Sequence, residues 1–142
     1  MQKMIFVNLP VTDLAATTRF YEAIGCQKNE QFSNEKAVSM VWSDTIFFML
    51  LTRPFFETFT PRAIADGHHT TEVLISLSME SRQKVDEITE AAASAGGRAD
   101  LRERQDHGFM YGRSCADPDG HIFEPVWMDP AFAAGGQQQG HA

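Results

Sequence analysis

The chain has 142 residues, of which 43% are hydrophobic, so it is long enough to bury a core and to form one domain. It carries 19 acidic and 12 basic residues, a net charge of −7, and its basic residues form no stripe, which argues against a nucleic-acid partner. The sequence has no apolar run long enough to span a bilayer and no secretory leader, so we expect no membrane partner and a cytoplasmic location.

The beginning of the chain predicts a strand followed by a capped helix. Residues 4–11 favour a strand, and Asp13 is a good helix N-cap. One face of the helix collects residues at positions i, i+3, i+7 and i+10: Leu14, Thr17, Tyr21 and Ile24. Gly25 stands where a C-terminal cap is expected, and strand-like runs follow at residues 37–42 and 45–51.

A linking segment follows at residues 54–70, where Pro54, Pro61 and Gly67 interrupt regular structure. Its large apolar residues are Phe55, Phe56, Phe59 and Ile64. They predict either a short helical arm that covers a pocket or a partner subunit, or side chains that pack on the sheet.

The same plan of elements then repeats. Residues 72–77 predict a strand, Ser81 can cap a helix, and Gly96-Gly97 ends that helix. The predicted apolar face again has the spacing i, i+3, i+7 and i+10: Val85, Ile88, Ala92 and Ala95. Strand-like runs follow at residues 108–115 and 121–128. A repeat of this size predicts two similar units that pack together.

A tight turn and a carboxylate mark the last predicted strand. The run Asp117-Pro118-Asp119-Gly120 favours a turn, because proline fixes φ and glycine accepts a positive φ. The strand that follows is apolar apart from Glu124. A carboxylate in such a strand is expected to be exposed, to be paired, or to bind a ligand.

The two cysteines, Cys26 and Cys115, lack the spacing of metal ligands. We expect two free buried thiols in a reducing compartment, with a disulfide or a nucleophile as the alternatives.

The opening pattern strand–LPVTDL–helix–FYEAIG and the closing DPDGHIFE resemble the vicinal oxygen chelate superfamily. Its members include glyoxalase I, extradiol dioxygenases, fosfomycin-resistance transferases and bleomycin-resistance proteins. The resemblance covers roughly residues 4–129. It implies an α+β fold in which paired βαβββ modules form curled mixed sheets around a cup-shaped pocket, the glyoxalase/bleomycin-resistance/dioxygenase fold. It also implies a homodimer.

The resemblance divides the chain into a single domain, residues 1–130, and a tail. Module one covers about 1–53, the linker about 54–70, and module two about 71–130. The tail, residues 131–142, is polar and low in complexity, so we expect it to be disordered.

Metal-dependent members of the family use four ligands, two on the first and last strands of each module, and the metal acts as a Lewis acid. Transferred to this chain, the second-module positions fall on Glu72 and Glu124. The first-module position falls on Phe6, with Asn8 next on the same face. The last strand of module one, residues 46–51, has no carboxylate, imidazole or amide. The resemblance therefore implies an incomplete site, with either a divalent metal (Zn, Ni, Mn, Fe or Co) on Glu72 and Glu124 or no metal.

The candidate site has Glu124 as its catalytic residue, acting as a general base beside a carbonyl or as a metal ligand. The candidate ligand-binding positions are Tyr111, Arg113, Phe6 and Asn8. Tyr111 and Arg113 alternate with their neighbours and therefore point to the same side of their strand. Arg113 could instead pair with Glu124. His68 and His69 are further candidate ligands, but a solvent-exposed histidine pair is the alternative, and His121 is expected to bond to the backbone of the turn.

These observations predict a glyoxalase-like protein, related to lactoylglutathione lyases and dioxygenases, that acts on or binds a small oxygenated molecule in its cup. The alternative is a metal-free protein of the bleomycin-resistance type that sequesters a small molecule. A regulatory or interaction module that uses the cup as a partner surface is a third hypothesis. Whether the protein is an enzyme stays open at this point.

Overall fold

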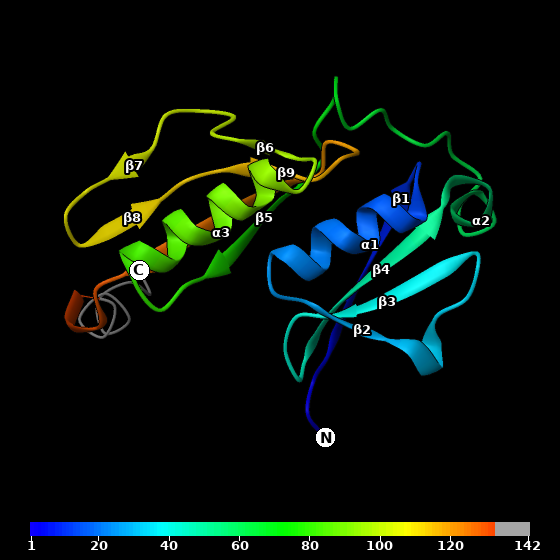
Figure 1. Cartoon of the computed structure of the whole chain (residues 1–142), viewed down its shortest axis with the longest axis horizontal. Helices are drawn as coiled ribbons and strands as arrows, with labels where there is room; N and C mark the ends of the chain where they lie inside the picture. The colour runs from blue at the N-terminus through cyan, green and yellow to red at the C-terminus, as the bar shows by residue number, and fades with distance from the viewer. Residues whose placement is uncertain (133–142) are drawn as a thin grey trace.

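The computed structural model describes residues 1–132 and contains two sheets, each with a long helix on one face (Figure 1). The first half consists of β1 (Ile5–Val11), α1 (Leu14–Ala23), β2 (Gln27–Asn29), the 3-10 helix η1 (Glu30–Phe32), β3 (Ala37–Val41), β4 (Ile46–Thr52) and α2 (Arg53–Glu57). The second half consists of β5 (Leu74–Ser78), α3 (Arg82–Ser94), β6 (Arg98–Ala99), β7 (Gln105–Asp106), β8 (Met110–Gly112), β9 (Cys115–Ala116) and β10 (Ile122–Met128).

Each sheet is built around a parallel pair made by the first and last strands of its module. The first sheet has the order β1-β4-β3-β2, with β1 parallel to β4. In the second sheet β5 is parallel to β10, and the other strands follow the order β6-β9-β10-β8-β7. The expected α+β fold with two βαβββ modules is therefore confirmed.

Two of the predicted strands differ in detail. The strand expected at 72–77 begins at Leu74, so Glu72 precedes it. The strand expected at 108–115 is divided into β8 and β9, and Arg113 and Ser114 lie between them.

The helix boundaries follow the predicted caps. The Asp13 side chain accepts a hydrogen bond from the Ala16 backbone at 3.0 Å, and the Ser81 hydroxyl accepts one from Lys84 at 3.1 Å. After each helix a glycine has positive φ, +115° at Gly25 and +97° at Gly96, which ends the helix without strain.

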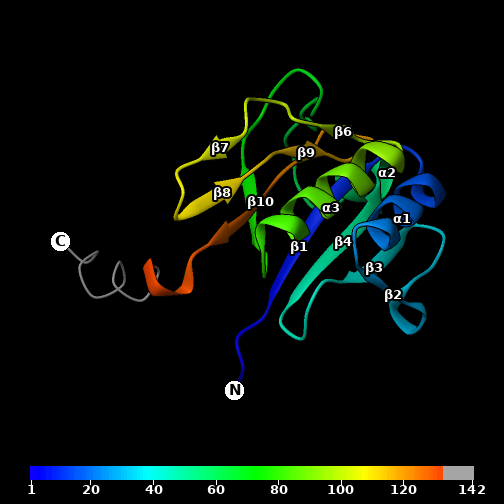
Figure 2. The same ribbon diagram turned by 60° about the vertical axis from the view of Figure 1, so that its left-hand side comes forward.

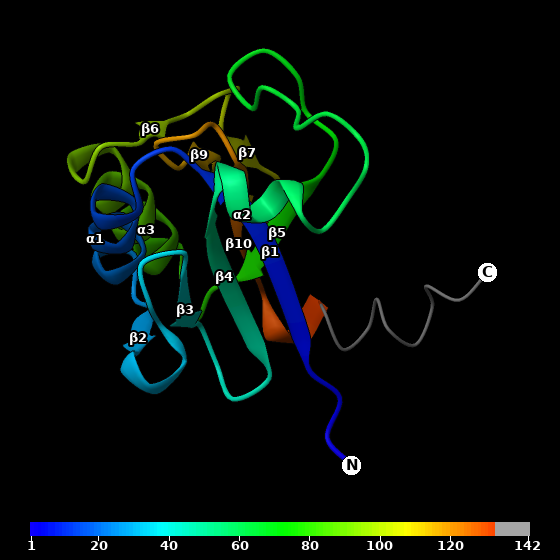
Figure 3. The ribbon, with the colours of Figure 1, turned by 90° about the vertical axis from the view of Figure 1, so that its right-hand side faces the viewer.

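The two modules share one hydrophobic core. Helices α1 and α3 lie side by side on one side of the sheets, and the segment that links the modules lies on the other (Figure 3). The Phe48 and Phe123 rings, one from each module, meet edge to face with centroids 5.3 Å apart, and Tyr21 lies 5.7 Å and 5.9 Å from them. The Phe48 and Phe123 rings belong to β4 and β10, so the core joins the first sheet, on the right in Figure 2, to the second sheet, on the left.

The segment of residues 58–73, called the linker loop below, passes directly over the turn between β9 and β10. A Cβ atom on Gly120 would lie 2.5 Å from the Gly67 carbonyl oxygen, and a Cβ on Gly67 would lie 2.5 Å from the Asp119 carbonyl oxygen. Glycine at both positions permits this close approach, which places the linker loop above the junction of the modules.

The end of the chain is described as far as Phe132. Of the tail expected to be disordered, Ala131 and Phe132 are described, and the Phe132 ring stacks on Phe109 with centroids 3.8 Å apart. Residues 133–142 lie outside the described part of the structure. Within residues 1–132, no helix has the length and apolar character needed to span a membrane.

Candidate functional site

Glu124 lies on β10 opposite Ser76 of β5 and lines a pocket of about 140 Å³. Its side chain is 18% exposed, and its Oε2 atom lies 3.0 Å from Nη2 of Arg102. The carboxylate is thus paired, as one of the sequence hypotheses allowed, but its partner is Arg102 and not Arg113. Arg102 lies in the irregular segment after β6, where no periodic pattern predicts its direction.

Glu72 does not lie beside Glu124. It lies near the end of the linker loop and lines a different cavity. Ser76 occupies the β5 position that pairs with Glu124, whereas Glu72 precedes the strand. Among residues 1–132, no group of three or more His, Cys, Asp or Glu side chains is arranged to bind a metal. The side chains of residues 1–132 in a single chain therefore do not supply the four metal ligands that metal-dependent relatives use.

Phe6 and Asn8 are exposed, because alternate residues of β1 point into the core. The Phe6 ring is 56% exposed and stacks on Phe47 of the neighbouring strand, with centroids 4.8 Å apart and planes inclined by 12°. These two positions lie in the first sheet, whereas the side chain of Glu124 lies in the second.

Tyr111 and Arg113 do point to the same side of the second sheet, but this side faces helix α3. The Tyr111 hydroxyl donates to Asp86 Oδ1 at 2.7 Å. The Arg113 side chain is 2% exposed and contacts three carboxylates: Asp86 at 3.0 Å, Glu90 at 2.8 Å and Asp100 at 2.7 Å. Both side chains therefore connect the sheet to the helix, and Arg113 also connects it to the segment after β6. Arg113 lines the pocket of Glu124 as well, but its guanidinium is bound by these carboxylates.

The buried arginine also changes the acidity of its neighbours. Its hydrogen bonds hold the pKa of the Asp100 carboxyl below the usual value. The pKa of Asp86 is likewise lowered, first by the Tyr111 hydroxyl and then by Arg113. These shifts indicate a structural role for Arg113 in the second module.

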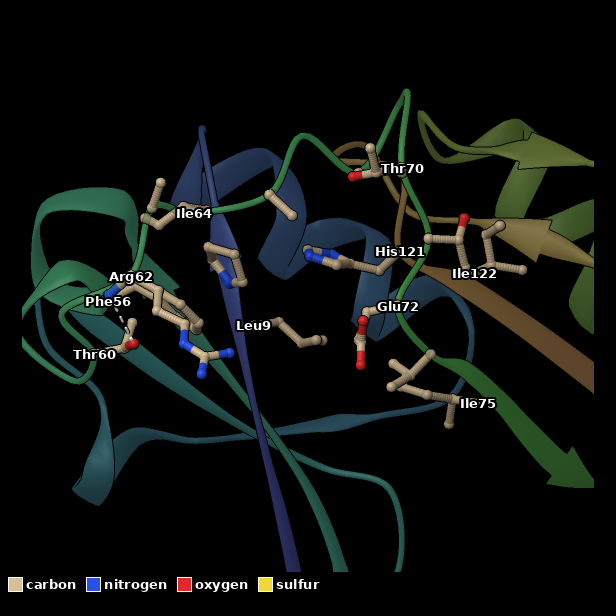
Figure 4. Close-up of a pocket in the computed structure, with 17 residues that line it drawn as sticks. Leu9, Phe56, Thr60, Arg62, Ile64, Thr70, Glu72, Ile75, His121 and Ile122 are labelled. Carbon is tan, nitrogen blue, oxygen red and sulfur yellow. Dashed lines mark hydrogen bonds between the residues drawn. The ribbon is translucent and has the colours of Figure 1, made fainter.

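A larger cavity of about 260 Å³ lies at the junction of the modules, under the linker loop (Figure 4). Its walls come from β1, from the start of β5 and β10, and from α2 and the linker loop. The large apolar residues that line it are Leu9, Phe56, Ile64, Ile75 and Ile122. Helix α2 is thus a short helical arm whose Phe56 faces a pocket, as one of the two linker hypotheses stated. Phe55 and Phe59 instead pack against each other, with ring centroids 5.1 Å apart.

Three polar side chains point into the same space, Arg62 and Glu72 from the linker loop and His121 from the turn just before β10 (Figure 4). Within residues 1–132, the Arg62 guanidinium and the Glu72 carboxylate form no ion pair. The sequence indicated Glu72 and His121 as candidates for other roles, but it gave no reason to select Arg62. Arg62 lies in a loop without periodicity, and a single arginine there resembles any solvated surface residue.

His121 is oriented by a buried carboxylate. The Asp117 side chain is fully buried, and its Oδ2 lies 2.8 Å from the His121 Nδ1 and accepts a hydrogen bond from the Tyr21 hydroxyl at 2.8 Å. Its Oδ1 accepts from the backbone N–H groups of Asp119 and His121, both at 2.9 Å. Burial and the nearby Asp117 raise the pKa of Tyr21 well above its usual value, so this phenol stays protonated and donates.

The two histidines of the linker loop, His68 and His69, have a different environment. His69 Nδ1 lies 2.7 Å from Asp66 Oδ2, and the pKa of Asp66 is lowered by this contact. His68 and His69 are both exposed, which matches the solvent-exposed alternative for the histidine pair.

The sequence profile of the Glyoxalase/Bleomycin resistance protein/Dioxygenase superfamily matches residues 3–124. The chain therefore belongs to this superfamily, whose two-module α+β architecture the structure shows. A comparison with curated proteins found no match.

Solved structures of similar shape support this assignment. A hypothetical protein from S. aureus is 26% identical with a TM-score of 0.74, and the match covers 89% of this chain and 94% of that one. A glyoxalase-related enzyme from Fulvimarina pelagi is 22% identical with a TM-score of 0.74, covering 89% and 88% of the two chains. A fosfomycin resistance protein from Mesorhizobium loti is 14% identical with a TM-score of 0.66, covering 94% and 98%. The last two show the fold alone.

Proposed function

We propose that this chain binds a small oxygenated molecule in the cavity under the linker loop, and that protein side chains recognise it in place of a four-ligand metal centre. The observation that carries the proposal is the cavity itself, in which an apolar wall surrounds Arg62, Glu72 and His121 (Figure 4). A mostly apolar pocket with a few convergent polar groups is the usual form of a small-molecule site.

The size of the cavity limits the ligand. Sites for drug-sized molecules measure roughly 300–1,000 Å³, and this cavity measures about 260 Å³. We therefore expect a compact ligand, such as a single ring with one or two polar substituents. This proposal is closer to a metal-free binding protein of the bleomycin-resistance type than to a metal-dependent glyoxalase.

A second candidate function uses the pocket of Glu124. Arg102 is 58% exposed, whereas Glu124 is 18% exposed, so Arg102 can move away while the carboxylate stays in place. The carboxylate could then accept a proton from a bound substrate, as expected for a glyoxalase-like lyase. Ligand location distinguishes the two candidates.

The test is a binding screen of small ring compounds by saturation-transfer NMR on the wild-type chain and two variants. Ala63→Trp adds a ring to the wall of the larger cavity, and the matched control Ser76→Trp adds one to the pocket of Glu124. Loss of binding in Ala63→Trp with binding retained in Ser76→Trp supports the proposal. The reverse result would assign the ligand to the pocket of Glu124.

A further inference from the structure

The Asp117 carboxylate determines which nitrogen of His121 is available to a ligand. A carboxylate accepts hydrogen bonds, and the Asp117 oxygens already accept three from Tyr21 and the turn backbone. The His121 Nδ1 at 2.8 Å must therefore donate to Asp117. In the neutral imidazole this leaves Nε2 as an acceptor.

The free nitrogen of His121 belongs to a ring that lines the cavity. The His121 side chain is 18% exposed, and its ring points into the cavity (Figure 4). Among residues 1–132, no side chain or backbone group donates to Nε2. A ligand hydroxyl can donate a hydrogen bond to this nitrogen.

The charges of the cavity determine the orientation of a charged ligand. The Arg62 guanidinium can bind a carboxylate with two parallel hydrogen bonds, and it has no ion pair within the described residues. Glu72 enters from the opposite side of the view, beside His121 (Figure 4). Its negative charge repels a ligand carboxylate, so the acid group is directed toward Arg62 and a hydroxyl toward His121.

Resting on the proposed function, we infer that the cavity binds a hydroxycarboxylic acid with an apolar ring between its two polar ends. Arg62 binds the carboxylate, Nε2 of His121 accepts a hydrogen bond from the hydroxyl, and the apolar wall contacts the ring. The Asp117–His121 pair is the recognition element for the hydroxyl. A neutral alcohol lacks the contact with Arg62, and an acid without a hydroxyl lacks the contact with His121.

Three probes separate these contacts: para-hydroxyphenylacetate, phenylacetate and para-hydroxybenzyl alcohol. Dissociation constants are measured by calorimetry on the full chain at one fixed, mildly alkaline pH. We expect para-hydroxyphenylacetate to bind about tenfold more tightly than either of the other two probes, because each of them lacks one polar contact.

Variants assign each contact to a residue. Arg62→Ala is expected to weaken both acids about tenfold and to leave the alcohol unchanged. The matched control is Arg19→Ala, which removes an exposed arginine of α1 and should change nothing. His121→Asn keeps an N–H near the position of Nδ1 for Asp117 but removes Nε2. It should weaken para-hydroxyphenylacetate about tenfold and leave phenylacetate unchanged.

Two results would overturn the inference while the proposed function stands: equal binding of the alcohol and the hydroxy acid, or an equal effect of Arg62→Ala on all three probes. If other ring compounds bind in the cavity and none of these three does, the inference also fails. Failure of every compound in the screen to bind at the cavity would remove the proposed function as well. Because Arg62 is exposed, the Arg62→Ala result does not depend on a variant that risks unfolding.

Discussion

Tyr21→Phe tests whether the buried network beneath the cavity stabilises the fold. The Tyr21 ring is 0% exposed, and its hydroxyl donates at 2.8 Å to the fully buried Asp117 carboxylate. The substitution keeps the ring contacts with Phe48 and Phe123 and removes one hydrogen bond to a charged acceptor. Such a bond contributes about 1.5–3 kcal/mol. We expect the free energy of unfolding to fall by that amount in urea titrations with an unchanged m-value.

The chain provides a matched control, because its other tyrosine also donates to an aspartate. The Tyr111 hydroxyl lies 2.7 Å from Asp86, but the Asp86 side chain is 45% exposed, so water replaces the lost donor. Tyr111→Phe is expected to cost about 0.5–1 kcal/mol. An equal or larger loss in Tyr111→Phe than in Tyr21→Phe would show that burial of the acceptor does not determine the cost.

Further predictions concern stability and assembly. Arg113→Met should lower the free energy of unfolding at pH 7 by about 2–4 kcal/mol, less than for a fully buried pair because its carboxylates are partly exposed. Because Arg113 lowers the pKa of Asp100, this contribution is present above about pH 4 and lost as the pH falls, so wild type and variant should converge in acid denaturation. Burial raises the pKa of Cys26 and Cys115 to about 12. The thiols of the unfolded chain ionise first, so the free energy of unfolding should fall above about pH 9, by up to ~1.4 kcal/mol per pH unit for each thiol. A thiol reagent should react with them only on unfolding. Gly120→Ala places a methyl group 2.5 Å from the backbone of the linker loop, at a residue whose φ is +89°. The free energy of unfolding should fall by about 2 kcal/mol or more, measured by thermal denaturation. Ligand binding should also weaken, measured by calorimetric titration. The homodimer implied by the family resemblance stays a prediction, and light scattering after size exclusion should give twice the chain mass of 15.9 kDa.

The parts of the structure that follow from local chemistry could be predicted from the sequence. Asp13 and Ser81 cap their helices as their residue types and spacing indicate, and Gly25 adopts the positive φ expected after a helix. The two motifs at the ends of the repeat indicated the family and therefore the order of the strands. The predictions of the caps and of the Gly25 turn depend on contacts between residues that are close in sequence.

The partners of the charged side chains could not be predicted in the same way. Alternation along a strand predicts that Tyr111 and Arg113 share a face, but it does not say which face the helix covers. Arg102 and Arg62 lie in irregular segments, so their contacts depend on how those segments cross the sheets. The register of β5 against β10 pairs Glu124 with Ser76, and Glu72, which precedes the strand, lines the larger cavity instead.

Methyl NMR of the full chain, during titration with the tightest compound of the small-molecule screen, identifies the pocket that the ligand occupies. The cavity has its own reporters in Leu9, Ile64, Ile75 and Ile122, whereas Val126 lines the pocket of Glu124. We predict that the largest shift changes occur at the isoleucine and leucine methyls under the linker loop, with little change at Val126. Changes centred on Val126 would contradict the assignment and place the ligand beside Glu124.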